Sequence, residues 1–212
     1  MTPRKWSAIT AAVVVSIGSA PPAAADGPPM PGIEIDGDTN SCTAGFAAQG
    51  PDGFYLMTSG HCDRDAGAQW TYGDDEPLGY MAASENDDSQ ELDAAIIRLD
   101  PDLGPPIGDI AGGYVVSGFL DGSQLPVGTP ICKVGATTGE TCGEVTSVDG
   151  LVAETSVFSL HGDSGSPGFV KNPDGTVSAV GLLSGSPDDD DYTTYFVLVA
   201  PLLGKWGLSL LP

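Results

Sequence analysis

Basic residues and histidine are scarce in this chain. Its 212 residues include two histidines, His61 and His161, and seven lysines and arginines against 29 aspartates and glutamates, so the formal net charge is −22. Such a surface disfavours binding to nucleic acid and repels acidic membrane surfaces, so we expect neither as a partner. Two interpretations remain open: a solvated acidic surface without a partner, or a surface that attracts cationic peptides.

Long apolar runs are absent after residue 25, so no later segment could span a membrane as a helix. Arg4 and Lys5 precede an apolar stretch over residues 6–20, and three alanines occupy 23–25. This pattern is typical of a secretory signal peptide over residues 1–25, and we expect cleavage after Ala25 and a secreted monomer. The alternative is a retained membrane anchor.

Cysteine is limited to four residues, which in an exported chain predict two disulfides with three possible pairings. Proximity favours Cys132–Cys142 as a hairpin staple, which leaves Cys42–Cys62. Zinc ligation by Cys42, His61 and Cys62 is the alternative, but the adjacent His61 and Cys62 lack the spacing of ordinary ligand pairs. We therefore expect neither a metal nor another cofactor.

Helical patterns are also few. Short alternating apolar runs separated by 30 glycines and 18 prolines predict many strands and turns, with strands over 53–58, 177–183 and 195–199. Only 200–208 suggests a short helix, with Pro201 in its first turn. The fold class is therefore all-β, arranged as one two-lobed enzyme or two small domains.

With so few histidines, the possible hydrolytic constellations can be enumerated. A Ser-His-Asp hydrolase needs a nucleophile, a base and a buried carboxylate. His61 lies in Thr-Ser-Gly-His-Cys, Asp93 opens the apolar run 93–99, and Ser164 lies in Gly-Asp-Ser-Gly. No histidine follows Ser164, which excludes the Ser-acid-His order of lipases. Three aspartates that do not open apolar runs could formally supply the subtilisin order: Asp36, Asp38 and Asp52.

Each of these residues also has a purely structural interpretation. Ser164 could be a turn serine among glycines, and His61 could cap a disulfide loop. Asp93 is harder to explain in this way, because a carboxylate that opens an apolar strand is costly to bury without a partner. The chain order His61, Asp93, Ser164 is the one that we expect to act.

At these motifs the chain resembles the chymotrypsin-like serine peptidases of family S1, most closely their bacterial streptogrisin and alpha-lytic branch. Segments 132–143, 193–197 and 206–210 extend the resemblance over nearly all of the chain after residue 40. It implies a trypsin-like fold of two six-stranded antiparallel β-barrels with the active site at their interface. The short segment 26–40 would precede an N-terminal barrel over 41–118 with His61 and Asp93, and a C-terminal barrel over 119–212 would hold Ser164.

The resemblance implies further roles, residue by residue. It implies the disulfides Cys42–Cys62 and Cys132–Cys142, and a buried Lys133–Asp163 ion pair that shapes the oxyanion loop; an exposed lysine is the alternative. The remaining implied roles are oxyanion amides from Gly162 and Ser164, a substrate-binding wall of Ser184, Gly185 and Ser186, and His161 at the pocket entrance.

Departures from the family pattern leave the pocket open to interpretation. Ser166 and Ser186 stand where the family usually has glycine, and the acidic run 188–191 follows the wall. That run could attract Lys or Arg side chains, bind calcium, or be a solvated turn.

Three functions follow from these observations. The first is a secreted serine endopeptidase that hydrolyses peptide bonds of a protein or peptide substrate through an acyl-enzyme. The second is an inactive homologue that acts as an extracellular binding module. The third is an esterase or a narrow-specificity processing peptidase.

Overall fold

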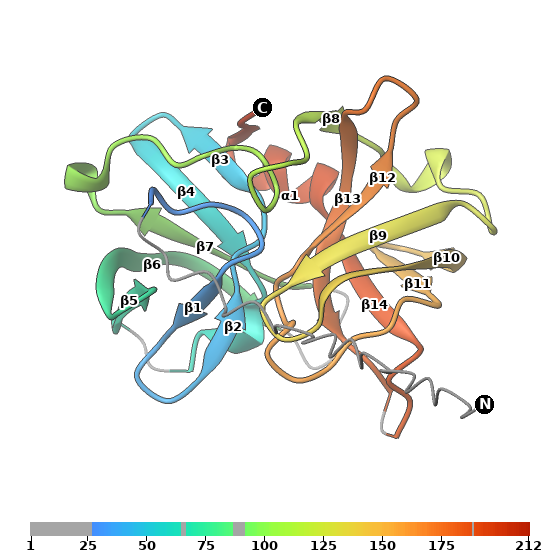
Figure 1. The fold of residues 1–212 in the computed structure, drawn as a ribbon, viewed down its shortest axis with the longest axis horizontal. Coiled ribbons are helices and arrows are strands. Elements are labelled where there is room, and N and C mark those ends of the chain that lie inside the picture. The colour runs from blue at the N-terminus through green and yellow to red at the C-terminus, as the bar shows by residue number, and fades with distance from the viewer. Residues whose placement is uncertain (1–26, 65–66, 87–91, 188) are drawn as a thin grey trace, which may run out of the picture.

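Two twisted sheets lie side by side, one formed mostly by the first half of the chain and one by the second (Figure 1). The structure is a computed structural model that describes residues 27–64, 67–86, 92–187 and 189–212. The predicted signal peptide lies outside the described residues. The all-β, trypsin-like fold is confirmed.

The first sheet contains eight strands in the order β15-β3-β4-β7-β6-β5-β1-β2, and every neighbouring pair is antiparallel. The strands are β1 (Glu34–Asp36), β2 (Ser41–Thr43), β3 (Ala47–Gly50), β4 (Gly53–Thr58), β5 (Gln69–Tyr72), β6 (Glu76–Asn86), β7 (Asp93–Leu99) and β15 (Ser209–Leu210). The strand predicted over 53–58 is β4. β7 lies between β4 and β6 and is buried at every residue except Arg98, which explains its continuous apolar run.

The second sheet closes into a barrel of six strands, because β12 pairs with both β9 and β13. Its strands are β9 (Pro130–Gly135), β10 (Gly139–Asp149), β11 (Val152–Thr155), β12 (Pro167–Lys171), β13 (Val177–Gly185) and β14 (Thr194–Leu198), and β8 (Val116–Phe119) adds to the edge of β13 in parallel. The predictions over 177–183 and 195–199 correspond to β13 and β14.

The predicted C-terminal helix is α1 (Val199–Trp206), one residue earlier at its start than expected. Pro201 lies in its first turn, and Gly207 ends it in the left-handed conformation with φ of 63°. Three short 3₁₀ turns complete the described elements: Gly60–Cys62, Pro101–Leu103 and Gly122–Gln124.

One apolar cluster joins the two halves and holds their facing edges together. Phe46 and Met57 from the first half pack in the same cluster as Phe169, Leu182 and Leu202 from the second. Burying one such side chain contributes about 1.5–3 kcal/mol relative to leaving it in water. Residues at the junction of the two halves are therefore held in place by packing from both sides.

Strand pairing does not follow the predicted division at residue 118. β8 crosses that boundary and pairs with β13, whereas β15, from the end of the chain, pairs with β3 of the first sheet. The division into domains therefore remains a prediction.

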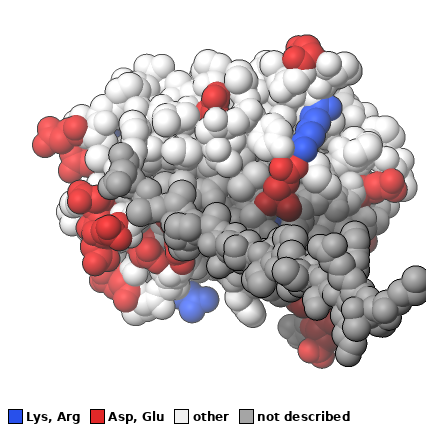
Figure 2. Space-filling view, viewed as in Figure 1, with Lys and Arg blue, Asp and Glu red and all other residues white. Residues whose placement is uncertain are grey.

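Acidic side chains are spread along the edge of the first sheet on the face shown in Figure 2, where few basic side chains are visible. Among the described residues, none of the helices is long and apolar enough to cross a membrane.

Candidate active site

His61 and Asp93 meet at one end of the first sheet. The ring Nδ1 of His61 lies 2.7 Å from Oδ2 of Asp93, and the backbone N–H of His61 donates to Oδ1 at 2.7 Å. His61 belongs to the 3₁₀ turn after β4, and Asp93 is the first residue of β7. That turn passes so close to β6 that a Cβ on Gly60 would stand 1.8 Å from the carbonyl oxygen of Glu85, so only glycine fits before His61.

Ser164 approaches from the second half of the chain and completes the contact. Its Oγ lies 2.9 Å from Nε2 of His61. Since Asp93 holds the Nδ1 side of the ring, Nε2 is left as an acceptor for the hydroxyl proton of Ser164. The three residues that the sequence predicts are thus within hydrogen-bond reach of one another.

Asp93 is buried beneath His61, with side-chain exposures of 4% and 31% respectively. Burial raises the pKa of Asp93, but the hydrogen bonds and charge of His61 and the hydroxyl of Ser184 outweigh it and hold that pKa below its usual value. The Ser184 hydroxyl donates to Oδ2 of Asp93 at 2.6 Å. Asp93 is therefore a carboxylate at neutral pH, which fixes and stabilises the imidazole without taking its proton.

The loop before Ser164 is held by two threonine hydroxyls. Thr137 donates to the carbonyl of His161 at 2.8 Å, and Thr43 donates to the carbonyl of Gly162 at 2.7 Å. Gly162 has φ of +95°. Within the described residues, the backbone N–H groups of Gly162 and Ser164 donate to no protein atom. Two donors on one turn are thus free for an oxygen atom beside Ser164.

The predicted ion pair between Lys133 and Asp163 is present and fully buried, with 3.0 Å between Nζ and Oδ2. Asp163 also accepts from the backbone N–H groups of Thr137, Thr138 and Leu160 and from the Thr138 hydroxyl. Burial acts to raise the pKa of Asp163, and these donors together with Lys133 lower it below its usual value. Burial lowers the pKa of Lys133, which Asp163 opposes.

A polar cleft of about 600 Å³ opens beside His61 and Ser164. It is lined by residues predicted from the resemblance to bind substrate: His161, Ser184, Gly185 and Ser186. The hydroxyl of Ser186 lies 3.0 Å from that of Ser159, which in turn lies 2.8 Å from that of Thr194. Neither Ser159 nor Thr194 lies in a sequence motif that predicts a role in the site.

The departure at Ser166 has a structural explanation. Its side chain is fully buried, and its hydroxyl donates to the carbonyl of Asp163 at 2.5 Å. The serine therefore fastens the turn that contains Ser164, and it does not face the cleft.

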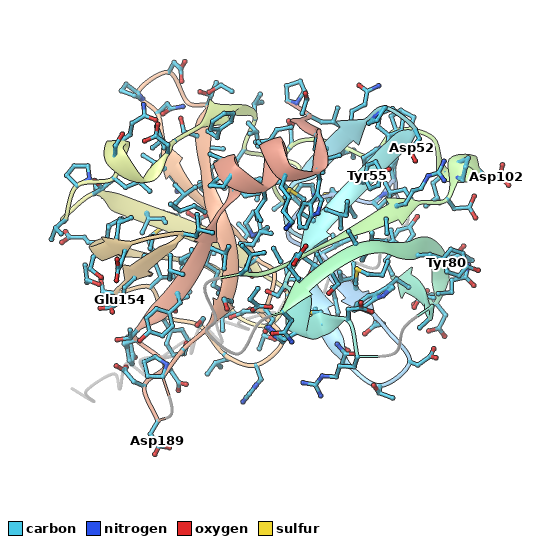
Figure 3. All side chains as sticks on the ribbon, turned by 180° about the vertical axis from the view of Figure 1, so that it is seen from behind. Asp52, Tyr55, Tyr80, Asp102, Glu154 and Asp189 are labelled. Atoms are coloured by element: carbon cyan, nitrogen blue, oxygen red, sulfur yellow. A yellow bond between two sulfur atoms is a disulfide. The ribbon has the colours of Figure 1, made fainter. Side chains whose placement is uncertain are left out.

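The described residues of the acidic run 188–191 lie in different environments. Asp188 lies outside the described residues. Asp190 accepts from Thr193 and from the backbone N–H of Tyr192, which makes it a turn residue. Asp189 and Asp191 line the cleft, and Asp189 projects from the tip of the loop after β13 (Figure 3).

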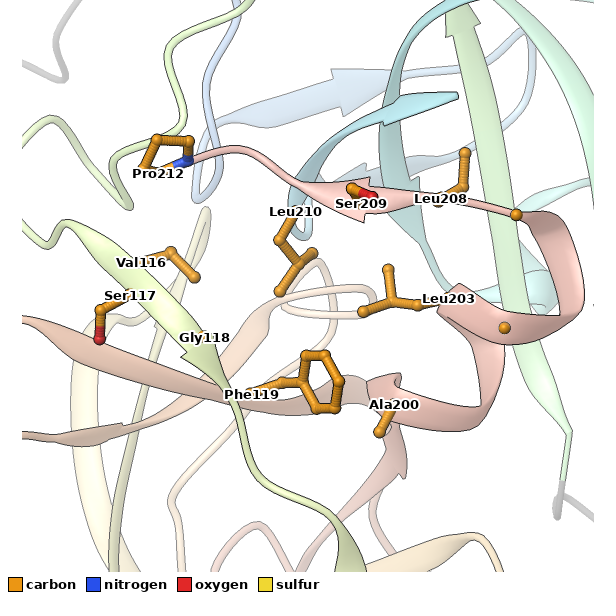
Figure 4. Close-up of a pocket in the computed structure, with 12 residues that line it drawn as sticks. Val116, Ser117, Gly118, Phe119, Ala200, Leu203, Leu208, Ser209, Leu210 and Pro212 are labelled. Carbon is orange, nitrogen blue, oxygen red and sulfur yellow. The ribbon is translucent and has the colours of Figure 1, made fainter. Parts of the chain in front are cut away.

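A larger hollow, of about 760 Å³, lies away from these residues between β8, α1 and β15 (Figure 4). Phe119, Leu203 and Leu210 give it an apolar lining, and no titratable side chain reaches it. Among the described residues its lining includes two serines, Ser117 and Ser209, but no side chain that could act as their base.

Both predicted cysteine pairs, Cys42–Cys62 and Cys132–Cys142, form disulfides. The sulfurs of Cys42 and Cys62 lie close to His61, but they are bonded to each other and offer no thiolate to a metal. The zinc alternative therefore does not fit these residues.

The described chain has the fold of the bacterial chymotrypsin-like serine proteases, and the resemblance inferred from its motifs is confirmed. A glutamic acid specific serine protease matches with a TM-score of 0.72 and 24% identity over 86% of this chain and 100% of that one. Chymotrypsin of Cellulomonas bogoriensis matches with a TM-score of 0.69 and 28% identity over 86% and 97% of the two chains.

Sequence comparison gives a relationship at a similar level of identity. An uncharacterised protein of Mycobacterium tuberculosis is 29% identical over 197 residues, which cover 87% of this chain and 86% of that protein. No protein-family model matches the chain.

Proposed function

We propose that this chain is a secreted serine endopeptidase in which Ser164 is the nucleophile, His61 the general base and Asp93 the residue that orients it. The observation that carries the proposal is the continuous contact from Asp93 through His61 to the Ser164 hydroxyl, at 2.7 and 2.9 Å. Serine is a weak nucleophile until a base within this reach takes its proton.

In the proposed reaction, Ser164 Oγ attacks the carbonyl carbon of the scissile peptide bond while its proton passes to Nε2 of His61. The lowered pKa of Asp93 keeps its negative charge beside the imidazolium that forms. His61 then gives the proton to the leaving amine, and a water molecule repeats the sequence to release the acid and regenerate Ser164.

The negative charge that grows on the former carbonyl oxygen needs preorganised donors. We assign this role to the backbone N–H groups of Gly162 and Ser164, which support it by having no other partner among the described residues. The Lys133–Asp163 pair supports the loop from beneath, so that no new chain terminus is needed to form it.

Two disulfides fit an extracellular protein, since such bonds persist in oxidising compartments. A narrow-specificity processing peptidase is the second candidate, because Ser159 and Ser186 line the cleft and their hydroxyls contact each other, so a substrate side chain that binds there must compete with this contact.

Mass spectrometry after treatment with an organophosphonate tests the proposal. We expect a single adduct on Ser164 that is absent from Ser164→Ala and strongly reduced in His61→Ala. Peptide cleavage should fall by roughly 10⁴–10⁶-fold in Ser164→Ala. A folded, disulfide-bonded protein that forms no adduct would instead favour the binding-module alternative.

A further inference from the structure

Three hydroxyl groups form a chain from the cleft into the second barrel. Ser186 is exposed at the cleft, Ser159 is buried with 3% exposure, and Thr194 is fully buried. The contacts run from Ser186 to Ser159 at 3.0 Å and from Ser159 to Thr194 at 2.8 Å, and Thr194 donates to the carbonyl of Val157 at 2.6 Å.

The contact between Thr194 and Val157 fixes which hydroxyl donates and which accepts at each step from Ser186 to Thr194. A carbonyl can only accept, so the single hydroxyl proton of Thr194 is committed to Val157. Ser159 must then donate its proton to Thr194, and Ser186 must donate its proton to Ser159. The buried Ser159 oxygen therefore faces the cleft with a lone pair and has no proton to offer there.

A substrate side chain that inserts between Ser186 and Ser159 breaks the contact between their hydroxyls. It then meets an acceptor at Ser159 and a donor at Ser186. A carboxamide complements both groups, since its NH₂ donates and its oxygen accepts. A carboxylate has no proton to donate to Ser159 at neutral pH, so one of its oxygens would lie against the Ser159 lone pair without a hydrogen bond.

We propose that the preferred substrate residue on the N-terminal side of the cleaved bond carries a carboxamide. The three hydroxyls would then select glutamine over glutamate, or asparagine over aspartate. This proposal rests on the proposed function. The acidic side chains at the cleft, Asp189 and Asp191, act in the same direction by repelling a carboxylate. The similar glutamic acid specific protease is described as using a histidine triad in substrate binding. This chain holds only His161 besides the proposed base His61, which is too few for such a triad.

The test uses two isosteric pairs of peptides that differ only before the cut, glutamine against glutamate and asparagine against aspartate. The kcat/KM values are measured at high salt, which screens the field of the exposed acids, and are divided by the fraction of Ser164 that an organophosphonate labels. In the unmodified chain we expect the amide of at least one pair to be preferred by about 10- to 100-fold, the cost of leaving one buried acceptor unpaired.

Two variants probe the direction of the protons. Thr194→Val removes the acceptor for Ser159, which can then donate into the cleft, so the amide preference should fall about tenfold or more. Ser159→Ala removes the lone pair and should also reduce the preference. Ser117→Ala, on β8 and outside the cleft, is the matched control and should leave the ratio unchanged.

The inference would be overturned if the unmodified chain cleaved the glutamate and aspartate peptides as fast as, or faster than, their amide counterparts. It would also be overturned if the chain cleaved only peptides with neither a carboxamide nor a carboxylate at that position. An unchanged ratio in Ser159→Ala would do so even if Thr194→Val failed to fold. These outcomes all require a labelled, active Ser164. Absence of both labelling and cleavage would instead refute the proposed function.

Discussion

At the scale of single residues, the orientation of one peptide bond decides whether the loop before Ser164 can stabilise an oxyanion. The carbonyl of His161 and the N–H of Gly162 belong to the same planar peptide. Since Thr137 holds the carbonyl on one side at 2.8 Å, the N–H points to the other. We infer that the Thr137 hydroxyl keeps the Gly162 N–H in the orientation that the proposed reaction needs.

Thr137→Val should lower kcat by about tenfold and leave KM nearly unchanged, because the lost contact matters for the charged transition state more than for the bound substrate. Thr137→Ser retains the hydroxyl and should restore most of the rate. Steady-state kinetics of the two variants provide the measurement. A rise in KM without a fall in kcat would contradict this role.

The residues that the sequence predicts and those that it misses differ in their chemical distinctiveness. His61 and Ser164 can be found because histidine is scarce and the serine has a glycine-rich context, and Asp93 because it opens an apolar strand. Thr43, Ser159 and Thr194 could not be found in this way. Their hydroxyls act through contacts with segments up to 119 residues away, and threonine and serine are common in turns and strands.

At the scale of elements, the β9–β10 hairpin supports the loop before Ser164, to which we assign the oxyanion role. β9 supplies Lys133, and the turn between the strands supplies Thr137 and Thr138, all of which contact the segment from His161 to Asp163. The Cys132–Cys142 disulfide joins the two strands at the base of this hairpin. A mutation in the hairpin should therefore affect both stability and catalysis.

Lys133→Met should lower the free energy of unfolding by about 3 kcal/mol at pH 7 and reduce kcat, because it leaves the buried Asp163 charge without its ammonium partner. Lys171→Met is the control. Lys171 makes an exposed pair with Glu140 at 2.5 Å, and its loss should cost less than about 1 kcal/mol. Urea denaturation and kinetics check both variants, and full activity of Lys133→Met would refute the supporting role.

The same pair gives a pH dependence with a defined sign. The pKa of Asp163 is lowered in the folded protein, so its contribution to stability is complete above the unfolded value of about 3.9. It is lost as the pH falls through the lower folded value. Below about pH 4 the free energy of unfolding should therefore fall more steeply with decreasing pH in the unmodified chain than in Lys133→Met, where no ammonium holds Asp163 ionised. Urea denaturation at a series of pH values provides the measurement, and equal slopes below about pH 4 would contradict this assignment.

Elements with a regular pattern could be predicted, and short irregular ones could not. β4, β13, β14 and α1 each follow from an apolar run with a clear boundary residue. The two residues of β15 carry no periodicity at all, and they become a strand only because β3 offers a free edge. The eleven residues of β6 contain a register shift between Met81 and Ala83 that interrupts alternation along the strand.

At the scale of the whole molecule, the end of the chain returns to the first sheet. Ser209 pairs with Gln49, and Leu210 pairs with Ala48. Leu208 is buried in the cluster that joins the two halves, and Leu211 packs against the core of the first. The last five residues thus belong structurally to the half in which the chain begins.

Deleting residues 208–212 should lower the free energy of unfolding by about 3–5 kcal/mol, from the lost burial of two leucine side chains and the lost strand pairing. Ser209→Ala is the control, since its side chain is exposed, and it should change stability by less than about 0.5 kcal/mol. Chemical denaturation compares the three proteins. An unchanged midpoint after deletion would show that β15 adds nothing to the fold.

The pairing of β15 with β3 also sets the order of events when the protein is made. Gln49 leaves the ribosome early but waits for Ser209, almost the whole chain later, before its strand has a neighbour on that side. Contacts of such long separation form late, after the intervening loop has closed. A nascent chain with His61, Asp93 and Ser164 already synthesised still lacks its final strand. The first sheet therefore gains its neighbour on this side only after the strands of the second barrel have been synthesised.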